Sequence, residues 1–238
     1  CIVSSQYGRD TSAAALLTIT TAPAWGIQWT MLSSSAGTMP PPKASGTEHT
    51  ASLVLDINKD GWTDFVIADR TTAPSVVWYQ RTYTGWTVRT IDSTLLPVEA
   101  GGAFFDIDKD GDLDIVFGGD AQSTLIWWWE NPYPSYTGAW TRRLIKNTGG
   151  TQHHDMIFAD ADGDGQTEFI YWNQLPRPGG DKLFFAEVPS APKTTQPWPA
   201  TQILSGRLYS EGLDTADVDG DGKLDLIGGG SWYKHTGG

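Results

Sequence analysis

The sequence predicts an all-β fold built from repeated four-stranded antiparallel sheets, and three observations support this prediction. The 238 residues include 27 Gly and 14 Pro, with many Thr, Trp and Tyr residues, a composition typical of short strands and tight turns. A carboxylate-rich segment of nine residues occurs four times along the chain. Apolar runs flank each copy, so each copy is expected to connect two strands as a hairpin loop.

The repeated segment has the form D-x-[DN]-x-D-G-x-x-[DE]. Its copies begin at Asp56, Asp106, Asp160 and Asp217, which are 50, 54 and 57 residues apart. A repeat of this length is typical of the blades of a β-propeller, in which each blade is a four-stranded antiparallel sheet. The predicted architecture is therefore a β-propeller.

Each unit contains strand-like runs in the same order around its loop. The first strand is expected over residues 51–55, 101–105, 156–159 and 213–216, and the second over 65–68, 115–118, 169–172 and 226–227. A third, aromatic strand is expected over 76–79, 125–129, 183–186 and 232–233, and a fourth over 86–91, 140–145 and 200–204. Four strands in this order make one blade.

The full blades are expected at about 45–92, 98–146 and 152–206, and partial blades at 1–35 and 208–238. Strands of the first partial blade are expected over 1–3, 16–19 and 26–32. Because both partial blades supply second and third strands, residues 1–238 are expected to be one propeller domain or a segment of a larger, seven-bladed ring. An irregular ring of five blades is the alternative.

The four loops are predicted to bind about four structural Ca²⁺ ions. Calcium takes six to eight oxygen ligands, and a loop can supply side chains at positions 1, 3, 5 and 9 and a backbone carbonyl at position 7. Glycine at position 6 allows the sharp turn. The predicted ligands are Asp56, Asn58, Asp60, Trp62, Asp64, Asp106, Asp108, Asp110, Asp112, Asp114, Asp160, Asp162, Asp164, Gln166, Glu168, Asp217, Asp219, Asp221, Lys223 and Asp225.

Two other interpretations of the loops are weaker. An EF-hand places a glutamate at position 12 between helices, whereas here the last acid is at position 9 and strands flank the loop. Ordinary turns are also rich in Asp, Asn and Gly, but four copies with the same acid spacing argue against turn formation alone.

The charge distribution agrees with metal binding. Sixteen of the 28 acidic residues lie in the four loops, and four Ca²⁺ ions would change the net charge from −12 to about −4. The acidity argues against binding to nucleic acid or to an anionic membrane surface. No run of 18 apolar residues predicts membrane insertion.

The loops and their flanking strands resemble the FG-GAP/VCBS-type repeats of extracellular propellers, over about residues 45–235. Trp128-Trp129-Glu130-Asn131-Pro132 also resembles a third-strand motif of such proteins. The resemblance implies an extracellular or cell-surface location, structural calcium ions, and a loop that joins the innermost strand of each blade to the second. Asn58 and Glu168 depart from all-aspartate loops but remain oxygen ligands.

If the innermost strand leads into the loop, its beginning lies at the opposite face near the propeller axis. The residues there form a candidate axial ligand site: His49, Glu99, His153, His154, Asp155 and Glu211. They would either line a wet channel or bind a ligand, with His and Glu as acid–base groups or as ligands of a second metal. Adjacent residues on a strand point to opposite faces, so one of the two neighbouring histidines is expected to reach the axis.

The 12 Trp residues are expected mainly in the core. Trp78, Trp127 to Trp129, Trp172 and Trp232 lie in predicted strands, whereas Trp62, Trp86 and Trp140 lie nearer turns and are expected to be exposed. Exposed Trp residues suit the binding of sugar rings.

Two functions remain open from the sequence. The first is a binding, adhesion or structural module, which recognises a glycan or a protein and belongs to a larger chain or assembly. The second is a carbohydrate-active enzyme that resembles polysaccharide lyases or sugar dehydratases, with catalysis at the axial His and Glu residues. Convergence of a histidine with Tyr or Arg would favour the enzyme.

Overall fold

The computed structural model describes residues 2–5, 8–11, 28–40, 48–176 and 179–237. Within these ranges the chain forms 17 strands and no helix, so the described protein is all-β as predicted. Consequently, this part of the chain has no helix that could cross a membrane.

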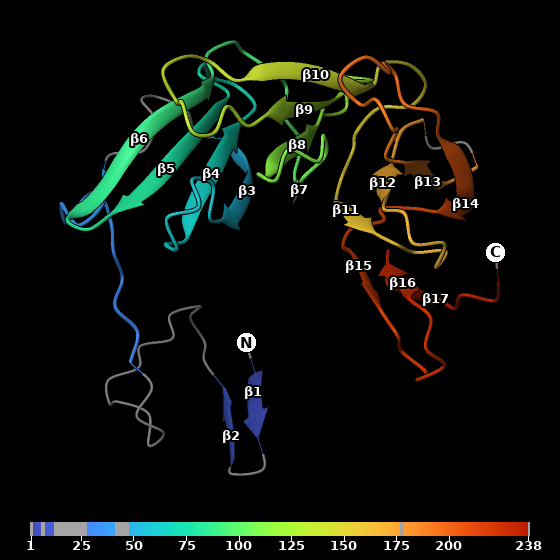
Figure 1. Ribbon diagram of the computed structural model, residues 1–238. Helices are drawn as coiled ribbons and strands as arrows, with labels where there is room; N and C mark the ends of the chain where they lie inside the picture. Colours follow the sequence, from blue (N-terminus) through green and yellow to red (C-terminus); the bar gives the residue numbers. More distant parts are fainter. Residues whose placement is uncertain (1, 6–7, 12–27, 41–47, 177–178, 238) are drawn as a thin grey trace.

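Four small antiparallel sheets follow one another along the chain (Figure 1). The first contains β3 (His49–Leu55), β4 (Asp64–Asp69), β5 (Val76–Thr82) and β6 (Gly85–Asp92). The second contains β7 (Ala103–Phe105), β8 (Asp114–Gly118), β9 (Ile126–Glu130) and β10 (Thr141–Lys146). The third contains β11 (Met156–Ala159), β12 (Glu168–Asn173), β13 (Asp181–Glu187) and β14 (Thr201–Arg207), and the fourth β15 (Leu213–Ala216), β16 (Asp225–Gly228) and β17 (Ser231–Tyr233).

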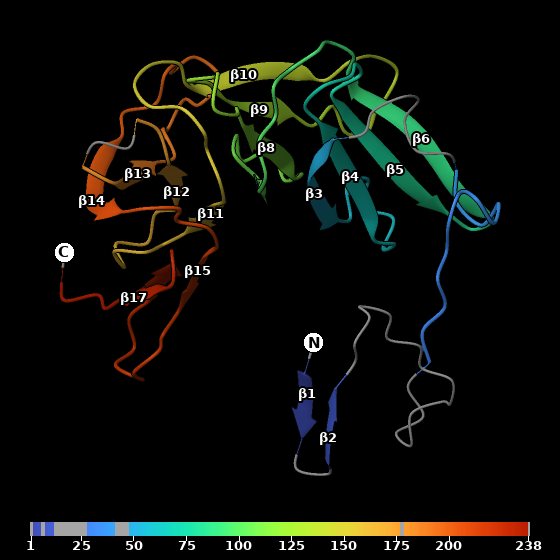
Figure 2. The same cartoon turned by 180° about the vertical axis from the view of Figure 1, so that it is seen from behind.

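The sheets have the strand order of propeller blades. Strands pair in sequence order within each sheet, and each repeated loop joins the first strand to the second. The first strands of neighbouring sheets meet, because β11 contacts both β7 and β15. Figures 1 and 2 show these strands on the inner side of an arc and β6, β10 and β14 on its outer side. The four sheets therefore adopt a β-propeller arrangement with the first strand innermost.

The hydrophobic core lies between the sheets. Strands β8 and β12 are buried along their whole length, because neighbouring sheets cover both of their faces. Large side chains fill the space between the first two sheets, including Trp78, Phe117 and Trp129, which are essentially inaccessible to solvent. This packing explains why the second and third strands are apolar on both faces instead of alternating.

The amino-terminal strand prediction is partly wrong. β1 (Ile2–Ser5) and β2 (Gly8–Thr11) pair as a two-stranded sheet, and residues 16–19 lie outside the described residues. Residues 28–32, which were expected to belong to a fourth strand, form no strand. Their side chains are exposed, and no described strand pairs with them to bury their apolar groups.

Most tryptophan predictions agree with the structure. Trp78, Trp127 to Trp129 and Trp172 are buried, Trp62 is 38% exposed, and Trp86, expected to be exposed, is half-buried. Two are wrong: Trp140 is buried against the first sheet, and Trp232 is 48% exposed on the three-stranded sheet. Neighbouring sheets rather than strand membership decide which indoles are covered.

Candidate calcium loops and axial site

The glycine at position 6 turns each loop back onto its first aspartate. The φ angle is +83° at Gly61, +93° at Gly111 and +88° at both Gly165 and Gly222, a left-handed conformation that glycine adopts without steric cost. The N–H of each of these glycines donates to the first carboxylate of its loop, over 2.8 to 3.1 Å. Position 6 therefore has the same role in all four loops.

The acid at position 9 accepts hydrogen bonds that link the end of its loop to the beginning of the loop and to the neighbouring strand. One of its oxygens accepts a hydrogen bond from the N–H of position 2 in every loop, over 2.7 to 3.3 Å. In three loops the other oxygen accepts an N–H from beyond the second strand: Arg81 donates to Asp64, Asn131 to Asp114 and His235 to Asp225. This acid therefore positions the loop against the third strand, or the segment after it, in addition to being a predicted ligand.

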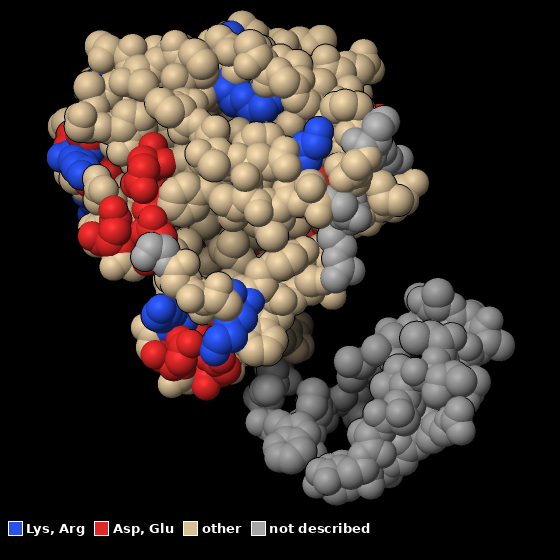
Figure 3. Space-filling view, turned by 90° about the vertical axis from the view of Figure 1, so that its right-hand side faces the viewer, with Lys and Arg blue, Asp and Glu red and all other residues tan. Residues whose placement is uncertain are grey.

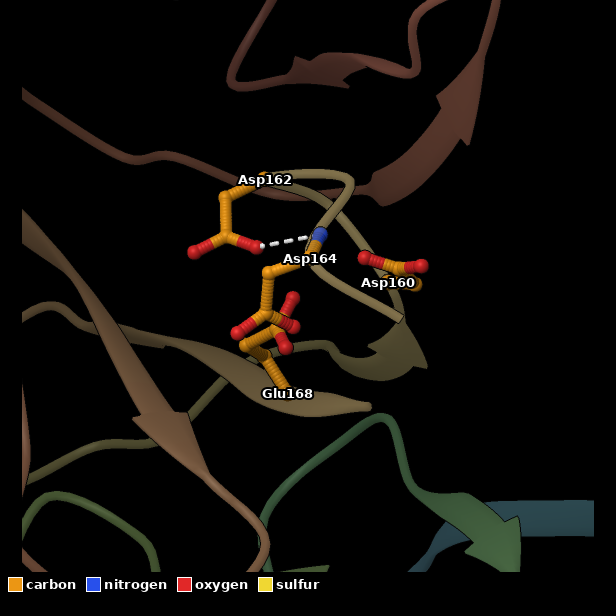
Figure 4. A group of neighbouring side chains, drawn as sticks. All are labelled: Asp160, Asp162, Asp164 and Glu168. Atoms are coloured by element: carbon orange, nitrogen blue, oxygen red, sulfur yellow. Dashed lines mark hydrogen bonds between the residues drawn. The ribbon is translucent and has the colours of Figure 1, made fainter. Parts of the chain in front are cut away.

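The acids of three loops converge. In each group the candidate ligand oxygens lie within 4.8 Å of one another: Asp160, Asp162, Asp164 and Glu168; Asp106, Asp108 and Asp110; Asp217, Asp219 and Asp225. Figure 4 shows the side chains of the third loop gathered around a common centre. Because carboxylates this close repel one another, these groups are suited to hold a metal cation.

The first loop differs by one amide. Asn58 stands at position 3, where its Nδ2 donates to Asp60 Oδ2 over 2.9 Å. The amide oxygen of Asn58 is buried and has no hydrogen-bond partner among the described residues. It remains a neutral oxygen donor beside Asp56 and Asp60, so this loop offers fewer negative charges than the other three.

Unsatisfied oxygens test whether the loops fit calcium. Asp106 Oδ1, Asp112 Oδ1 and Glu168 Oε1 are buried and have no hydrogen-bond partner among the described residues. A buried polar atom without a partner costs about 1–3 kcal/mol. Calcium is a hard cation that takes oxygen ligands, and would satisfy such atoms. The residues present therefore fit the ion.

Burial and mutual repulsion raise the pKa of several loop acids. Burial, together with the charges of Asp108 and Asp112, raises the pKa of Asp114 to about 8. Burial raises the pKa of Asp112 to about 7, with a further contribution from Asp110. Burial also raises the pKa of Glu168 to about 7. A bound cation would oppose these shifts by favouring the ionised carboxylates.

Lysine side chains contact the acids of two loops. Lys193 Nζ lies 2.6 Å from Asp108 Oδ2 and 2.7 Å from Glu130, and Lys234 Nζ contacts both Asp219 and Asp221. The third loop has no Lys or Arg in ion-pair contact among the described residues. On the face shown in Figure 3, acidic side chains gather in patches, and basic side chains lie beside the lower patch.

The comparison with family models agrees with the repeated loops. The model of the FG-GAP-like repeat matches residues 56–117 and 106–171, which contain the first three loops. This part of the chain belongs to the FG-GAP-like repeat family. No curated protein matches the chain. FG-GAP-like repeats often bind calcium, in agreement with the oxygen-rich loops described above.

At the opposite end of the FG-GAP-like blades, residues of three successive sheets meet. Arg70, which follows β4, lies with Nη2 2.5 Å from Glu99 Oε1, and Glu99 precedes β7. His154, which precedes β11, has Nε2 3.5 Å from the same Glu99 oxygen. Glu48 Oε2 lies 3.6 Å from Arg70 Nε. We call Glu48, Arg70, Glu99 and His154 the axial cluster.

The remaining predicted axial residues have other surroundings. His49 Nε2 lies 3.6 Å from Asp69 Oδ2, and Asp155 accepts a hydrogen bond from the Gly212 N–H over 2.7 Å. Glu211 is exposed and lines a shallow groove on the fourth sheet.

The two neighbouring histidines have different environments. His153 is fully buried, with its Nε2 3.4 Å from Lys146 Nζ and its ring edge-on to Tyr171. Burial lowers the pKa of His153 to about 3. His153 thus points into the core beside Lys146, and His154 is the histidine that belongs to the axial cluster.

Sequence reasoning missed Arg70 and Asp69 in this site. Asp69 ends β4 and Arg70 follows it. Because β4 pairs antiparallel with β3, their position beside the beginning of the first strand follows from the hairpin itself. The pairing of His49 with Asp69 is the register that brings them there. Polar residues at or just after the ends of the first three second strands were the signal that could have found them: Asp69-Arg70, Asp120 and Asn173-Gln174.

Proposed function

We propose that this chain is an extracellular, calcium-stabilised binding module that recognises a glycan at the axial end of its blades. The observation that supports this most strongly is the axial cluster, in which Arg70, Glu99 and His154 converge from three sheets. Glu99 is 4% exposed, whereas Arg70 and His154 are partly exposed. The cluster therefore presents two partly exposed basic side chains that are held by a buried carboxylate. Hydrogen-bonding groups held this way suit the hydroxyl groups of sugars.

Calcium is proposed to stabilise the blades rather than to bind the glycan. The loops lie at the opposite ends of the first strands from the axial cluster. A ligand that binds only the folded state stabilises it by mass action. Excess chelator should lower the melting temperature and added calcium should restore it. An unchanged melting temperature, with no metal retained, would contradict this part of the proposal.

The axial site is tested by substitution. A glycan array probed with the wild-type protein should identify ligands, and His154→Ala and Arg70→Gln should weaken their binding while retaining the calcium-dependent melting temperature. Glu211→Gln, a charge removal outside the axial cluster, serves as the control. If the wild-type protein binds no glycan, the glycan proposal fails.

An enzyme is the second candidate function, and one observation favours it. His154 contacts Glu99 beside Arg70, an arrangement in which imidazole and carboxylate could transfer a proton next to a fixed positive charge. A lyase acting on acidic polysaccharides would produce unsaturated ends that absorb ultraviolet light. Absence of such products across a broad panel would leave binding as the function.

The proposal also includes an extracellular location for the protein and a number of blades for the ring. FG-GAP-like repeats are typical of extracellular proteins, which supports a secreted or cell-surface location, in adhesion or in a larger chain or assembly. Seven blades remain the proposed size of the ring. Electron microscopy of the full-length protein would count them.

A further inference from the structure

A shallow cleft borders the first loop on the side of the hairpin of β5 and β6, and it is separate from the axial cluster. It consists of two adjoining hollows of about 430 and 410 Å³, between the loop and the hairpin of β5 and β6. Trp62 and Arg81 line both hollows. The other lining residues are Asp60, Thr63, Gln80, Thr82, Tyr83 and Trp86.

Aromatic side chains are exposed at this cleft. Trp62 is 38% exposed and Tyr83 is 90% exposed, with ring centroids 6.3 Å apart and planes inclined by 31°. Trp86 also lines the cleft and makes an edge contact with Phe65, 5.0 Å between ring centroids. Exposed aromatic faces beside polar groups suit the apolar face of a sugar ring.

Arg81 is the basic residue of the cleft, and its guanidinium packs on Trp86 without an acidic partner. Its Cζ lies 4.9 Å from the centre of the Trp86 ring, across the strand pair. Among the described residues, the guanidinium makes no ion pair or hydrogen bond. Four other arginines of the described blades each bond a carboxylate or an amide: Arg70, Arg89, Arg142 and Arg143. In a chain with 28 acids and 16 bases, an arginine without such a partner is unusual.

We propose that this cleft binds a sugar that carries a carboxylate, such as a uronic acid unit of a polysaccharide. The sugar ring stacks on Trp62, and its carboxylate pairs with the guanidinium of Arg81, whose planar group suits two parallel hydrogen bonds. Asp60 also lines the cleft, and its carboxylate repels an anionic ligand. Asp60 is a predicted calcium ligand, so a bound calcium ion would neutralise this repulsion. The sugar should therefore bind more tightly in the presence of calcium. This inference rests on the proposed glycan recognition and adds a second site to it.

The probe is trigalacturonate, measured by isothermal titration calorimetry in calcium. Its carboxyl-reduced, neutral counterpart is the control ligand. Arg81→Gln should raise the dissociation constant for trigalacturonate about tenfold or more, because it removes a charge-assisted pair, and should leave any weak binding of the neutral counterpart unchanged. Trp62→Ala should weaken both. Arg142→Gln, which removes the same charge on the second sheet away from the cleft, should bind as the wild type does.

The outcomes separate this site from the axial one. Equal affinity for the charged and neutral sugars, or unchanged binding in both cleft variants, would overturn the cleft proposal. If His154→Ala instead abolished binding, glycan recognition would stand at the axial cluster alone. Self-association that disappears in Trp62→Ala without sugar binding would assign the cleft to a second copy of the chain. If no glycan bound the wild-type protein, both proposals would fail.

Discussion

Position 4 of each loop has a left-handed backbone, like the glycine two residues later. It is occupied by Gly163 and Gly220 in two loops, but by Lys59 (φ 56°) and Lys109 (φ 60°) in the other two. A residue with a Cβ pays a steric cost in this conformation. The turn that brings position 5 towards position 1 therefore costs more in the first two loops.

Replacing one of these lysines by glycine should stabilise the protein. Lys109→Gly relieves the left-handed strain, offset in part by the greater freedom of glycine in the unfolded chain, and should raise the free energy of unfolding by about 0.5–1 kcal/mol. Thermal melts in calcium measure the change. Lys109→Ala keeps the strain and removes the same charge, so it should not stabilise. Equal stabilisation by both variants would attribute the effect to charge.

At the residue scale, the sequence predicted a backbone conformation only where the residue type itself favours that conformation. Glycine at position 6 signals a left-handed turn, which is observed four times. Lysine at position 4 carries no such signal, and only the neighbouring loops with glycine there hinted at the conformation. Trp140 was expected to be exposed but is covered by the adjacent sheet, a contact that its own turn does not reveal.

At the scale of elements, the loops differ in the basic side chains that would compete with a bound calcium ion. The third loop has four convergent acids and no basic side chain in ion-pair contact among the described residues. In the fourth, Lys234 contacts Asp219 and Asp221. The third loop should therefore bind calcium most tightly.

Removing the competing ammonium should strengthen the fourth site. Lys234→Gln should lower the dissociation constant for calcium at that loop about two- to tenfold, the size expected for exposed ion pairs. Isothermal titration of the chelator-treated protein resolves the change. Lys223→Gln removes a charge from the same loop without touching its acids, and should have a smaller effect. Weaker binding in Lys234→Gln would show that the lysine supports the site.

Asn131 joins the loops of two neighbouring blades. Its Nδ2 donates to the carbonyl groups of Ile57 and Leu113, both over 3.1 Å, and its N–H donates to Asp114. The resemblance singled out the segment that contains Asn131, but the function of the amide follows only from the second blade packing on the first.

Asn131→Ala should therefore destabilise the protein. The change removes the amide donor of the Leu113 carbonyl and one of the two donors of the Ile57 carbonyl, which keeps the Tyr136 hydroxyl at 3.2 Å. Loss of these bonds at a buried site costs about 1–3 kcal/mol. Asn147→Ala, at an exposed position, is the matched control and should have little effect. Thermal melts of both variants in calcium give the comparison. Equal stability of both variants would contradict the bridging role.

At the scale of the whole molecule, removal of calcium should reverse the dependence of stability on pH. The pKa values of Asp114, Asp112 and Glu168 are raised to about 8, 7 and 7. Between their ordinary values near 4 and these raised values, the metal-free folded state holds more protons than the unfolded state. Its stability should therefore fall as the pH rises from about 4 to 8.

The measurement is the melting temperature between pH 5 and 8, with BAPTA and with calcium. Metal-free protein should melt at a lower temperature at pH 8 than at pH 5, whereas calcium, which binds ionised carboxylates, should remove or invert this trend. Asp92 and Glu130 have lowered pKa values, so their effects appear below about pH 4, outside the window. His153, whose pKa is lowered to about 3, opposes the trend below about pH 6.5, but the three acids outweigh this one group. A melting temperature that rises with pH in BAPTA would contradict the prediction.

The blade plan could be predicted because each unit contains its own loop, strands and turns. The expected first strands at 156–159 and 213–216 coincide with β11 and β15. The axial cluster could be predicted only in part, because Arg70 reaches Glu99 across a blade boundary. Such contacts depend on how the sheets sit beside one another, which local sequence patterns do not specify.

Two backbone hydrogen bonds that link the fourth strands of neighbouring blades run in the same direction along the chain. Trp140, before β10, donates its N–H to Ile91 of β6, and Trp198, before β14, donates to Ile145 of β10. In each case the later blade reaches back to the fourth strand of the earlier one. A ribosome completes each earlier fourth strand before it makes the tryptophan that will bond to it. Blades can therefore dock one after another during translation, because the fourth strand that accepts each bond has already been synthesised.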